Sequence, residues 1–155
     1  MLSEQYLALY ASALSFFLKS EIDNPKGRKG GYFTVVSAST GETECDVLCV
    51  GQPEPSLPLA DFAREKARRL FQNAEHISGF QSRNPDAGQW GGAVRANEQM
   101  IFSMSGMPEF VDEAINLCVA MKLQAITESR LLDIIAVSKN PYLNLIRTFA
   151  SATNR

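Results

Sequence analysis

The chain has 155 residues, of which 45% are hydrophobic and 21% charged, and its formal net charge is -2. These values are typical of a globular protein, and the length fits one domain, residues 1–155, that needs no metal or disulfide to stabilise it. The slightly acidic balance argues against a nucleic-acid partner, because phosphate recognition requires a clustered basic face. The three cysteines are too few for a disulfide framework, which favours a reducing, cytoplasmic location.

The first segment is predicted to be a buried helix from Ser3, a suitable N-cap, to about Ile22. Its apolar residues cover more than a narrow stripe, so we expect burial on two sides, against a sheet and against another helix or subunit. The thirteen-residue apolar run from Tyr6 to Leu18 is too short to span a bilayer, and it lacks the flanking features of a signal peptide. We therefore expect no membrane partner.

A hairpin is predicted next. Residues 26–31 are a basic, glycine-rich connector that lacks the Gly-Lys-Ser/Thr ending of a phosphate loop. The β-branched and aromatic runs Tyr32–Ser39 and Thr43–Val50 are separated by residues 40–42, which contain the glycine of a turn. Cys45 and Cys49 are expected to share one face of the second strand about 13 Å apart, too far for a disulfide.

A second helix is predicted from about Leu59 to Glu75, after the proline-rich residues 51–58. Lys66 falls within its apolar arc, so its stem is expected to be buried while its ammonium reaches outward or toward a pocket. Basic and acidic residues are mixed on this helix, which favours a solvated face over a docking patch; they are Arg64, Lys66, Arg68 and Arg69, with Asp61, Glu65 and Glu75.

The second half contains another hairpin followed by helices. After a polar loop at residues 76–88, the runs Gln89–Ala96 and Gln99–Ser105 are predicted to pair, and a helix follows from Met107-Pro108 to about Leu123. Two shorter helices are predicted near Glu128–Ser138 and Tyr142–Ala150. Hairpins imply an antiparallel sheet. The order therefore predicts an α+β fold, with a core at about residues 3–123 and a C-terminal helical extension at about 127–151.

No catalytic machinery is evident. The single histidine, His76, is not accompanied by a Gly-x-Ser-x-Gly elbow, and too few His and Cys residues are grouped for a catalytic zinc, so we expect no metal site. His76 is expected to interact with the dipole at the end of the second helix. The alternative is that His76 ligates haem. Four methionines could in principle be axial haem ligands, but they are expected to pack in the interior instead; they are Met100, Met104, Met107 and Met121.

The segment most suggestive of ligand binding combines two glycine-containing stretches. Gly91-Gly92 permits close approach of a ligand or of another backbone segment, and the helix start near Met107 offers free N–H groups to an anion. Arg83 and Arg95 would complete a clamp for a carboxylate. The alternative interpretation is a tight loop and a helix cap. The candidate ligand-binding residues are Lys66, Arg83, Gly91, Gly92, Arg95, Ser105, Gly106 and Met107.

In these residues the chain resembles the haem-degrading-domain-like (GlcG/HbpS-like) family over about residues 33–123. The matching pieces are a strand pair within residues 33–50, Lys66-Ala67, Gly91-Gly92-Ala93-Val94, Phe102–Gly106 and Asp112-Glu113-Ala114. The resemblance implies a profilin-like fold, in which an antiparallel sheet of four to five strands has helices on both faces, and frequently a homo-oligomer. A fifth strand would be Ala125-Ile126. Family members are linked to haem, corrinoids or small metabolites. The positions that carry over are Lys66, Gly91, Gly92, Ser105, Gly106, Asp112 and Glu113.

Three hypotheses follow for the function. The leading one is a small-molecule-binding or sensing module without its own catalysis, whose ligand lies in a glycine-lined notch. The second is a haem-binding or haem-degrading protein that uses His76 or a methionine. The third is a structural protein that forms homo-oligomers through its first and last helices, motivated by Leu143, Ile146 and Phe149. Asp112 and Glu113 are adjacent on a helix and point about 100° apart, so they are not expected to act as a carboxylate pair.

Overall fold

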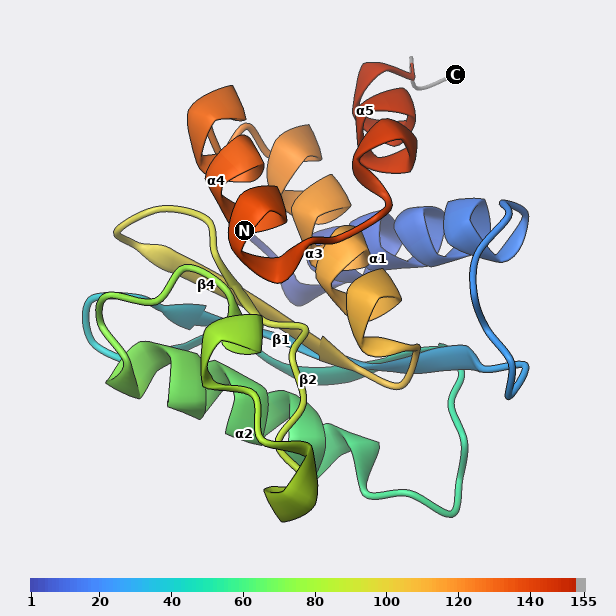
Figure 1. Cartoon of the computed structure of the whole chain (residues 1–155), viewed down its shortest axis with the longest axis horizontal. Helices are drawn as coiled ribbons and strands as arrows, with labels where there is room; N and C mark the ends of the chain where they lie inside the picture. The colour runs from blue at the N-terminus through green and yellow to red at the C-terminus, as the bar shows by residue number, and fades with distance from the viewer. Residues whose placement is uncertain (153–155) are drawn as a thin grey trace.

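The computed structural model describes residues 1–152 as one antiparallel sheet and five α-helices (Figure 1). The sheet order is β2-β1-β4-β3, and each neighbouring pair is antiparallel. The α+β prediction is therefore confirmed. The elements are α1 (Ser3–Leu18), β1 (Lys29–Ser37), β2 (Thr43–Gln52), α2 (Leu59–Gln72), the 3-10 turns η1 (Gly79–Ser82) and η2 (Pro85–Ala87), β3 (Val94–Arg95), β4 (Met100–Ser105), α3 (Glu109–Lys122), α4 (Glu128–Ser138) and α5 (Leu143–Ser151).

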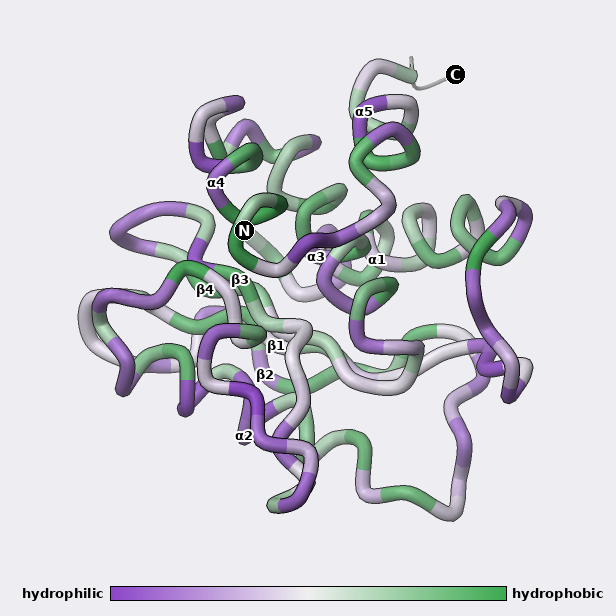
Figure 2. The backbone as a smooth tube through the Cα atoms, in the orientation of Figure 1, coloured by the Kyte–Doolittle hydropathy of each residue, from purple (hydrophilic) through white to green (hydrophobic). Residues whose placement is uncertain are grey.

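Helices cover both faces of the sheet. Helix α2 lies along one face, while α1 and α3 lie on the other, with α4 and α5 beyond them (Figure 1). The larger apolar cluster fills the space between the sheet and α1, α3, α4 and α5, and a smaller one lies between the sheet and α2. Figure 2 shows hydrophobic segments concentrated where these layers meet. Within residues 1–152, no helix has the length and apolar character needed to cross a membrane.

Helix α1 packs on the sheet through aromatic residues at helical spacing. The ring of Tyr10 stacks on Phe33 of β1 with centroids 3.9 Å apart. The N-cap lies one residue earlier than expected: Leu2, not Ser3, is the N-cap, and its N–H donates to Oε1 of Gln5 at 2.9 Å. It ends at Leu18, short of the expected Ile22.

Strand β2 contains an irregularity that reverses the side-chain alternation. Phe33 pairs with Leu48 and Val35 with Cys45, so β2 has an extra residue in this stretch. Such a bulge shifts the following side chains to the opposite face. Cys45 is consequently buried in the core whereas Cys49 is exposed, and the expectation that they share one face is wrong.

Strand β3 is much shorter than predicted. Its expected first half, residues 89–93, does not pair with β4, because side chains of α3 bind the backbone there. The N–H of Gly91 donates to Glu109 at 2.8 Å, and the carbonyl of Gly92 accepts from Asn116 Nδ2 at 2.6 Å. Within residues 1–152, Ala125-Ile126 forms no strand, so the described sheet has four.

The C-terminal helices match their predicted positions and pack on the core. Thr127 caps α4 by accepting from the N–H of Arg130 at 3.0 Å. Helix α5 packs against α3 and α1, with Phe149 edge-on to Phe16. The apolar residues that suggested an interface, Ile146 and Phe149, are thus buried within the chain. A homo-oligomer stays a prediction.

Candidate functional site

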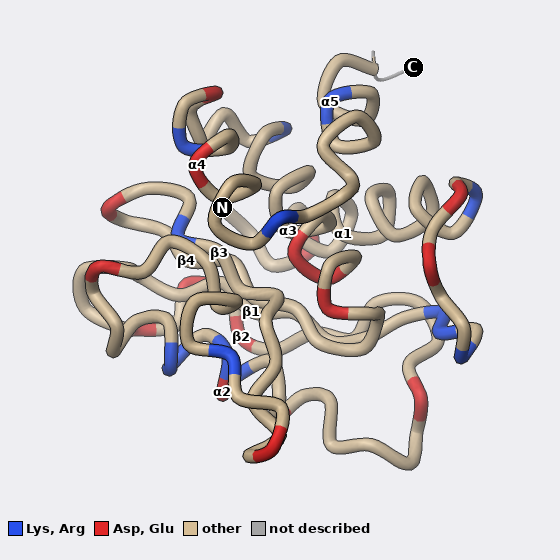
Figure 3. Tube along the Cα trace, viewed as in Figure 1, with Lys and Arg blue, Asp and Glu red and all other residues tan. Residues whose placement is uncertain are grey.

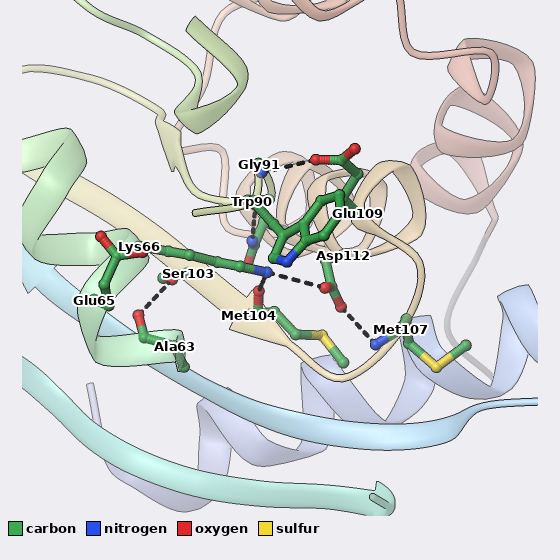
Figure 4. Close-up of polar contacts among 12 residues, drawn as sticks. Ala63, Glu65, Lys66, Trp90, Gly91, Ser103, Met104, Met107, Glu109 and Asp112 are labelled. Atoms are coloured by element: carbon green, nitrogen blue, oxygen red, sulfur yellow. Dashed lines mark hydrogen bonds and ion pairs between the residues drawn. The ribbon is translucent and has the colours of Figure 1, made fainter. Parts of the chain in front are cut away.

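A buried ion pair joins α2 to the first turn of α3 (Figure 4). Lys66 Nζ lies 3.2 Å from Oδ2 of Asp112 and donates to the carbonyl oxygen of Met104 at 3.0 Å. The other carboxylate oxygen of Asp112 accepts the N–H of Met107 at 3.0 Å. The side chains of Lys66 and Asp112 are only 4% and 1% exposed. The ammonium therefore points into the protein and not outward. The groups that it meets there are Asp112 and the Met104 carbonyl.

The local structure explains why both charges are buried here. Lys66 lies on the sheet-facing side of α2, and Asp112 lies in the first turn of α3, where the helix dipole and free N–H groups favour a carboxylate. Burial nevertheless dominates and raises the pKa of Asp112 to about 7, against the lowering effects of Lys66 and of the backbone N–H groups of Met107 and Gly106. Near neutral pH, the Asp112 carboxyl thus exists in both protonation states.

Glycine is required beside this pair. Gly92 has φ +136°, and a Cβ atom there would lie 3.0 Å from Lys66 Nζ. Gly106 has φ +142°, and a Cβ atom there would lie 2.3 Å from the carbonyl oxygen of Gly30. Both glycines allow close approach, which was predicted from the sequence for Gly92 but not for Gly106. The neighbours that approach are the Lys66 side chain and strand β1. The expected notch is filled by protein groups in this structure.

The segment with Trp90 precedes Gly92, which lies beside the ion pair, and is held by specific contacts. Glu109 accepts the N–H of Gly91 at 2.8 Å and forms an ion pair with Arg83 at 2.6 Å. The guanidinium of Arg83 lies 5.3 Å from the ring centroids of both Phe80 and Trp90. In Figure 4 the Trp90 ring is drawn over the Lys66–Asp112 pair, yet 41% of its surface is exposed.

Part of the predicted set of site residues lies at this ion pair. Lys66 is one of its two members, and Met107 and Gly92 lie beside it. Gly91 and Arg83 contact Glu109 instead. We call this group, together with Asp112 and Trp90, the Lys66 site. Ser105 and Gly106 end strand β4 beside it and shape the backbone where β4 meets β1.

Arg95 does not join the Lys66 site. Its guanidinium donates to the carbonyl oxygens of Leu70 at 2.7 Å and His76 at 2.9 Å, and so caps the C-terminal end of α2. These bonds use carbonyls that a helix end leaves free. The expected Arg83–Arg95 clamp for a carboxylate is therefore not formed.

Two functional candidates were missed in the sequence. Glu109 fell within the helix predicted from Met107-Pro108, and Trp90 within the strand predicted at Gln89–Ala96, and neither was singled out as a site residue. Two signals could have identified Trp90: it stands next to Gly91-Gly92, and it is the only tryptophan in the chain. Glu113, adjacent to Asp112, points elsewhere, as the helical spacing predicts; it accepts from Ser78 and Ser138 hydroxyls at 2.5 Å each.

His76 lies outside the Lys66 site. It follows α2, its carbonyl oxygen accepts from Arg95, and its ring Nδ1 is buried without a hydrogen-bond partner in the described part of the chain. Met104 and Met107 pack in the core. Residues 1–152 contain no group of three or more His, Cys, Asp or Glu arranged to hold a metal ion. Haem ligation by His76 stays a prediction, and a Soret shift of haemin that disappears in His76→Ala would support it.

We compared the chain with protein-family models, with curated proteins and with solved structures, and none of these comparisons gave a match.

Proposed function

We propose that the chain is a binding or sensing module for a small carboxylate, with Lys66 as the ligand's cation. The observation that carries the proposal is a spare hydrogen-bond donor on a buried ammonium. A lysine ammonium has three N–H donors. Two are used by Met104 and Asp112, and within residues 1–152 the third has no acceptor in hydrogen-bond distance.

The physical setting favours an anion at this position. A hydrogen bond between an ammonium and a carboxylate is stronger than one between neutral groups, and it strengthens further away from water. Gly92 lacks the Cβ that would otherwise contact Lys66 Nζ. The raised pKa of Asp112 adds to this, because a protonated Asp112 leaves Lys66 without its counter-charge.

In this proposal a ligand reaches the buried Lys66 by displacing residues 83–91. The covering residues 83–91 are mainly exposed and contain no regular element longer than the turn η2. They are attached to the rest of the protein through polar contacts, chiefly Glu109 with Gly91 and Arg69 with the Trp90 carbonyl. Displacing these contacts uncovers the ion pair, which is a movement suited to a sensor.

Thermal-shift measurements with acetate, glycolate, succinate and benzoate test the proposal, because a ligand that binds only the folded state raises the Tm with concentration. We expect at least one carboxylate to raise the Tm of the wild type and of Lys29→Met, an exposed-lysine control. The shift should be lost in the double variant Lys66→Met/Asp112→Asn, which removes both buried charges together. Equal shifts in the double variant, or no shift with any of the four, would refute the proposal.

A further inference from the structure

A hollow lies on the side of α2 away from Lys66, between this helix and the β1–β2 hairpin. Its volume is about 380 Å³, which is within the range of small-molecule sites. It shares no lining residue with the Lys66 site. We call it the α2 groove; it is lined by Thr34, Val36, Thr40, Gly41, Thr43, Asp46, Arg64, Ala67, Arg68, Phe71 and Gln72.

The α2 groove exists because α2 does not cover the whole sheet. Helix α2 packs mainly on β4 and β1 and touches the edge strand β2 less. The face of β2 beside the hairpin turn is therefore open. Gly41 in that turn approaches the ring of Phe71 so closely that a Cβ atom would lie 3.0 Å from it, and this contact closes one end of the groove.

The floor and the two walls of the groove differ in character. The floor is apolar, formed by the buried Val36 and Ala67 with the partly buried Phe71. Hydroxyls of Thr40 and Thr43 line the hairpin side. A groove of this kind suits a ligand whose apolar part lies on the floor and whose polar groups lie at the level of the hydroxyls.

The helix wall is basic. Arg64 and Arg68 are four residues apart on α2, so they lie on the same side of the helix. Arg64 contacts Asp61 at 3.2 Å. Arg68, by contrast, has no carboxylate oxygen within 4.0 Å among residues 1–152. A planar guanidinium of this kind suits a ligand carboxylate.

The hairpin wall is acidic. Asp46 is exposed on β2, and in the described chain its carboxylate accepts only the N–H of Val47, at 2.8 Å. It has no Lys or Arg nitrogen within ion-pair distance among residues 1–152. Figure 3 shows both signs of charge near α2 and the neighbouring strands. The groove therefore presents a cationic wall and an anionic wall above an apolar floor.

We infer that the α2 groove binds a small zwitterion with an apolar body, namely an α-amino acid with an apolar side chain. Its carboxylate lies against Arg68, its ammonium lies against Asp46, and its side chain lies on Phe71 and the floor. A simple anion would be repelled by Asp46 and a simple amine by the arginines. Only a ligand with both charges satisfies both walls.

Calorimetric titration with L-leucine and its two one-charge analogues tests this inference. The analogues are 4-methylvalerate, which lacks the ammonium, and isoamylamine, which lacks the carboxylate. We expect L-leucine to bind, and each analogue to bind at least about tenfold more weakly, since each loses one charge-assisted contact. Undetectable binding of L-leucine, or a one-charge analogue that binds as tightly, would overturn the inference.

Crossed variants sharpen the test. Arg68→Ala should weaken L-leucine and 4-methylvalerate but not isoamylamine, and Asp46→Ala should weaken L-leucine and isoamylamine but not 4-methylvalerate. Arg147→Ala and Asp133→Ala are exposed controls on α5 and α4, and should change none of the affinities. L-leucine binding that survives both groove variants would place the ligand elsewhere. The double variant Lys66→Met/Asp112→Asn should still bind L-leucine, so this inference and the proposed function fail independently.

Discussion

Lys66 and Asp112 form an ion pair between two helices on opposite faces of the sheet, with Nζ and Oδ2 3.2 Å apart and both side chains buried. Removing two charges from water is costly, and a buried pair often contributes little net stability compared with uncharged groups of the same size. Fold stability alone is therefore a weak reason for keeping this pair, and the proposed ligand binding at Lys66 would supply another.

Removing one charge of this pair should cost more than removing both. At pH 8, Lys66→Met leaves the Asp112 carboxyl buried without its cation, so the folded chain must hold either an unpaired charge or a proton that the unfolded chain lacks. We expect the free energy of unfolding to fall, by at most about 3–5 kcal/mol. Lys66→Met/Asp112→Asn should recover most of this loss, because Asn still offers an oxygen to the Met107 N–H. Urea unfolding of the three proteins measures the difference, and a double variant as unstable as Lys66→Met would contradict the interpretation.

The stability of the wild type should depend on pH through Asp112. Its pKa is about 7 in the folded chain and 3.8 for the free group, so the folded state holds this proton more tightly than the unfolded state. The stabilisation from the proton is complete below about pH 4 and is lost as the pH rises through about 7, with a slope of at most about 1.4 kcal/mol per pH unit.

Asp112→Asn isolates this effect. Burial also raises the pKa of the neighbouring Glu113, so Glu113 adds to the pH dependence of stability in the same direction, but it does so in both proteins. Urea unfolding between pH 5 and pH 8 should give a flatter profile for Asp112→Asn than for the wild type. Parallel profiles would show that Asp112 does not titrate in this range.

The cover over the Lys66 site should loosen when Glu109 loses its charge. Glu109→Gln weakens the contacts to Arg83 and to the Gly91 N–H, which hold Trp90 in place. We expect stronger acrylamide quenching of Trp90 fluorescence and faster hydrogen exchange at Gly91. Because these contacts are partly exposed, the free energy of unfolding should change by only about 1 kcal/mol. Glu98→Gln, at an exposed ion pair with Arg130, is the control.

Arg95→Ala should impair stability and leave carboxylate binding intact. The variant removes the Arg95 donor from the His76 carbonyl and leaves the Leu70 carbonyl with only the Asn73 N–H, at 3.2 Å, and we expect a loss of about 1–3 kcal/mol. This outcome separates the role that the structure gives Arg95 from the clamp expected in the sequence. A weakened affinity for a bound carboxylate, at unchanged stability, would favour the clamp.

Local patterns predicted most of the elements. The position of α4 was predicted correctly at Glu128–Ser138, and the first hairpin was predicted because Gly41 separates two β-branched runs. The short β3 was not predictable, since its missing pairs depend on Glu109 and Asn116, which approach from a helix later in the sequence. The bulge in β2 likewise depends on its pairing with β1.

The candidate site was predicted in part for the same reason. Lys66 stood out as a charge within an apolar helix face, and Gly92 as one of a glycine pair, and the structure places them together. Arg95 was assigned to a ligand because nothing in the sequence shows that the end of α2 lies beside it. Long-range packing decides which polar group a buried arginine binds, and no local pattern encodes that choice.

The fluorescence of Trp90 offers the most direct test of carboxylate binding, because this is the only tryptophan in the chain and it lies two residues from Gly92, which adjoins Lys66 Nζ. Titration with the carboxylate that gives the largest thermal shift should change the Trp90 emission in a saturable way. The change should be absent in Lys66→Met/Asp112→Asn and retained in Lys29→Met. An emission that never responds in the wild type, or that responds equally in the double variant, would show that Lys66 does not hold the ligand.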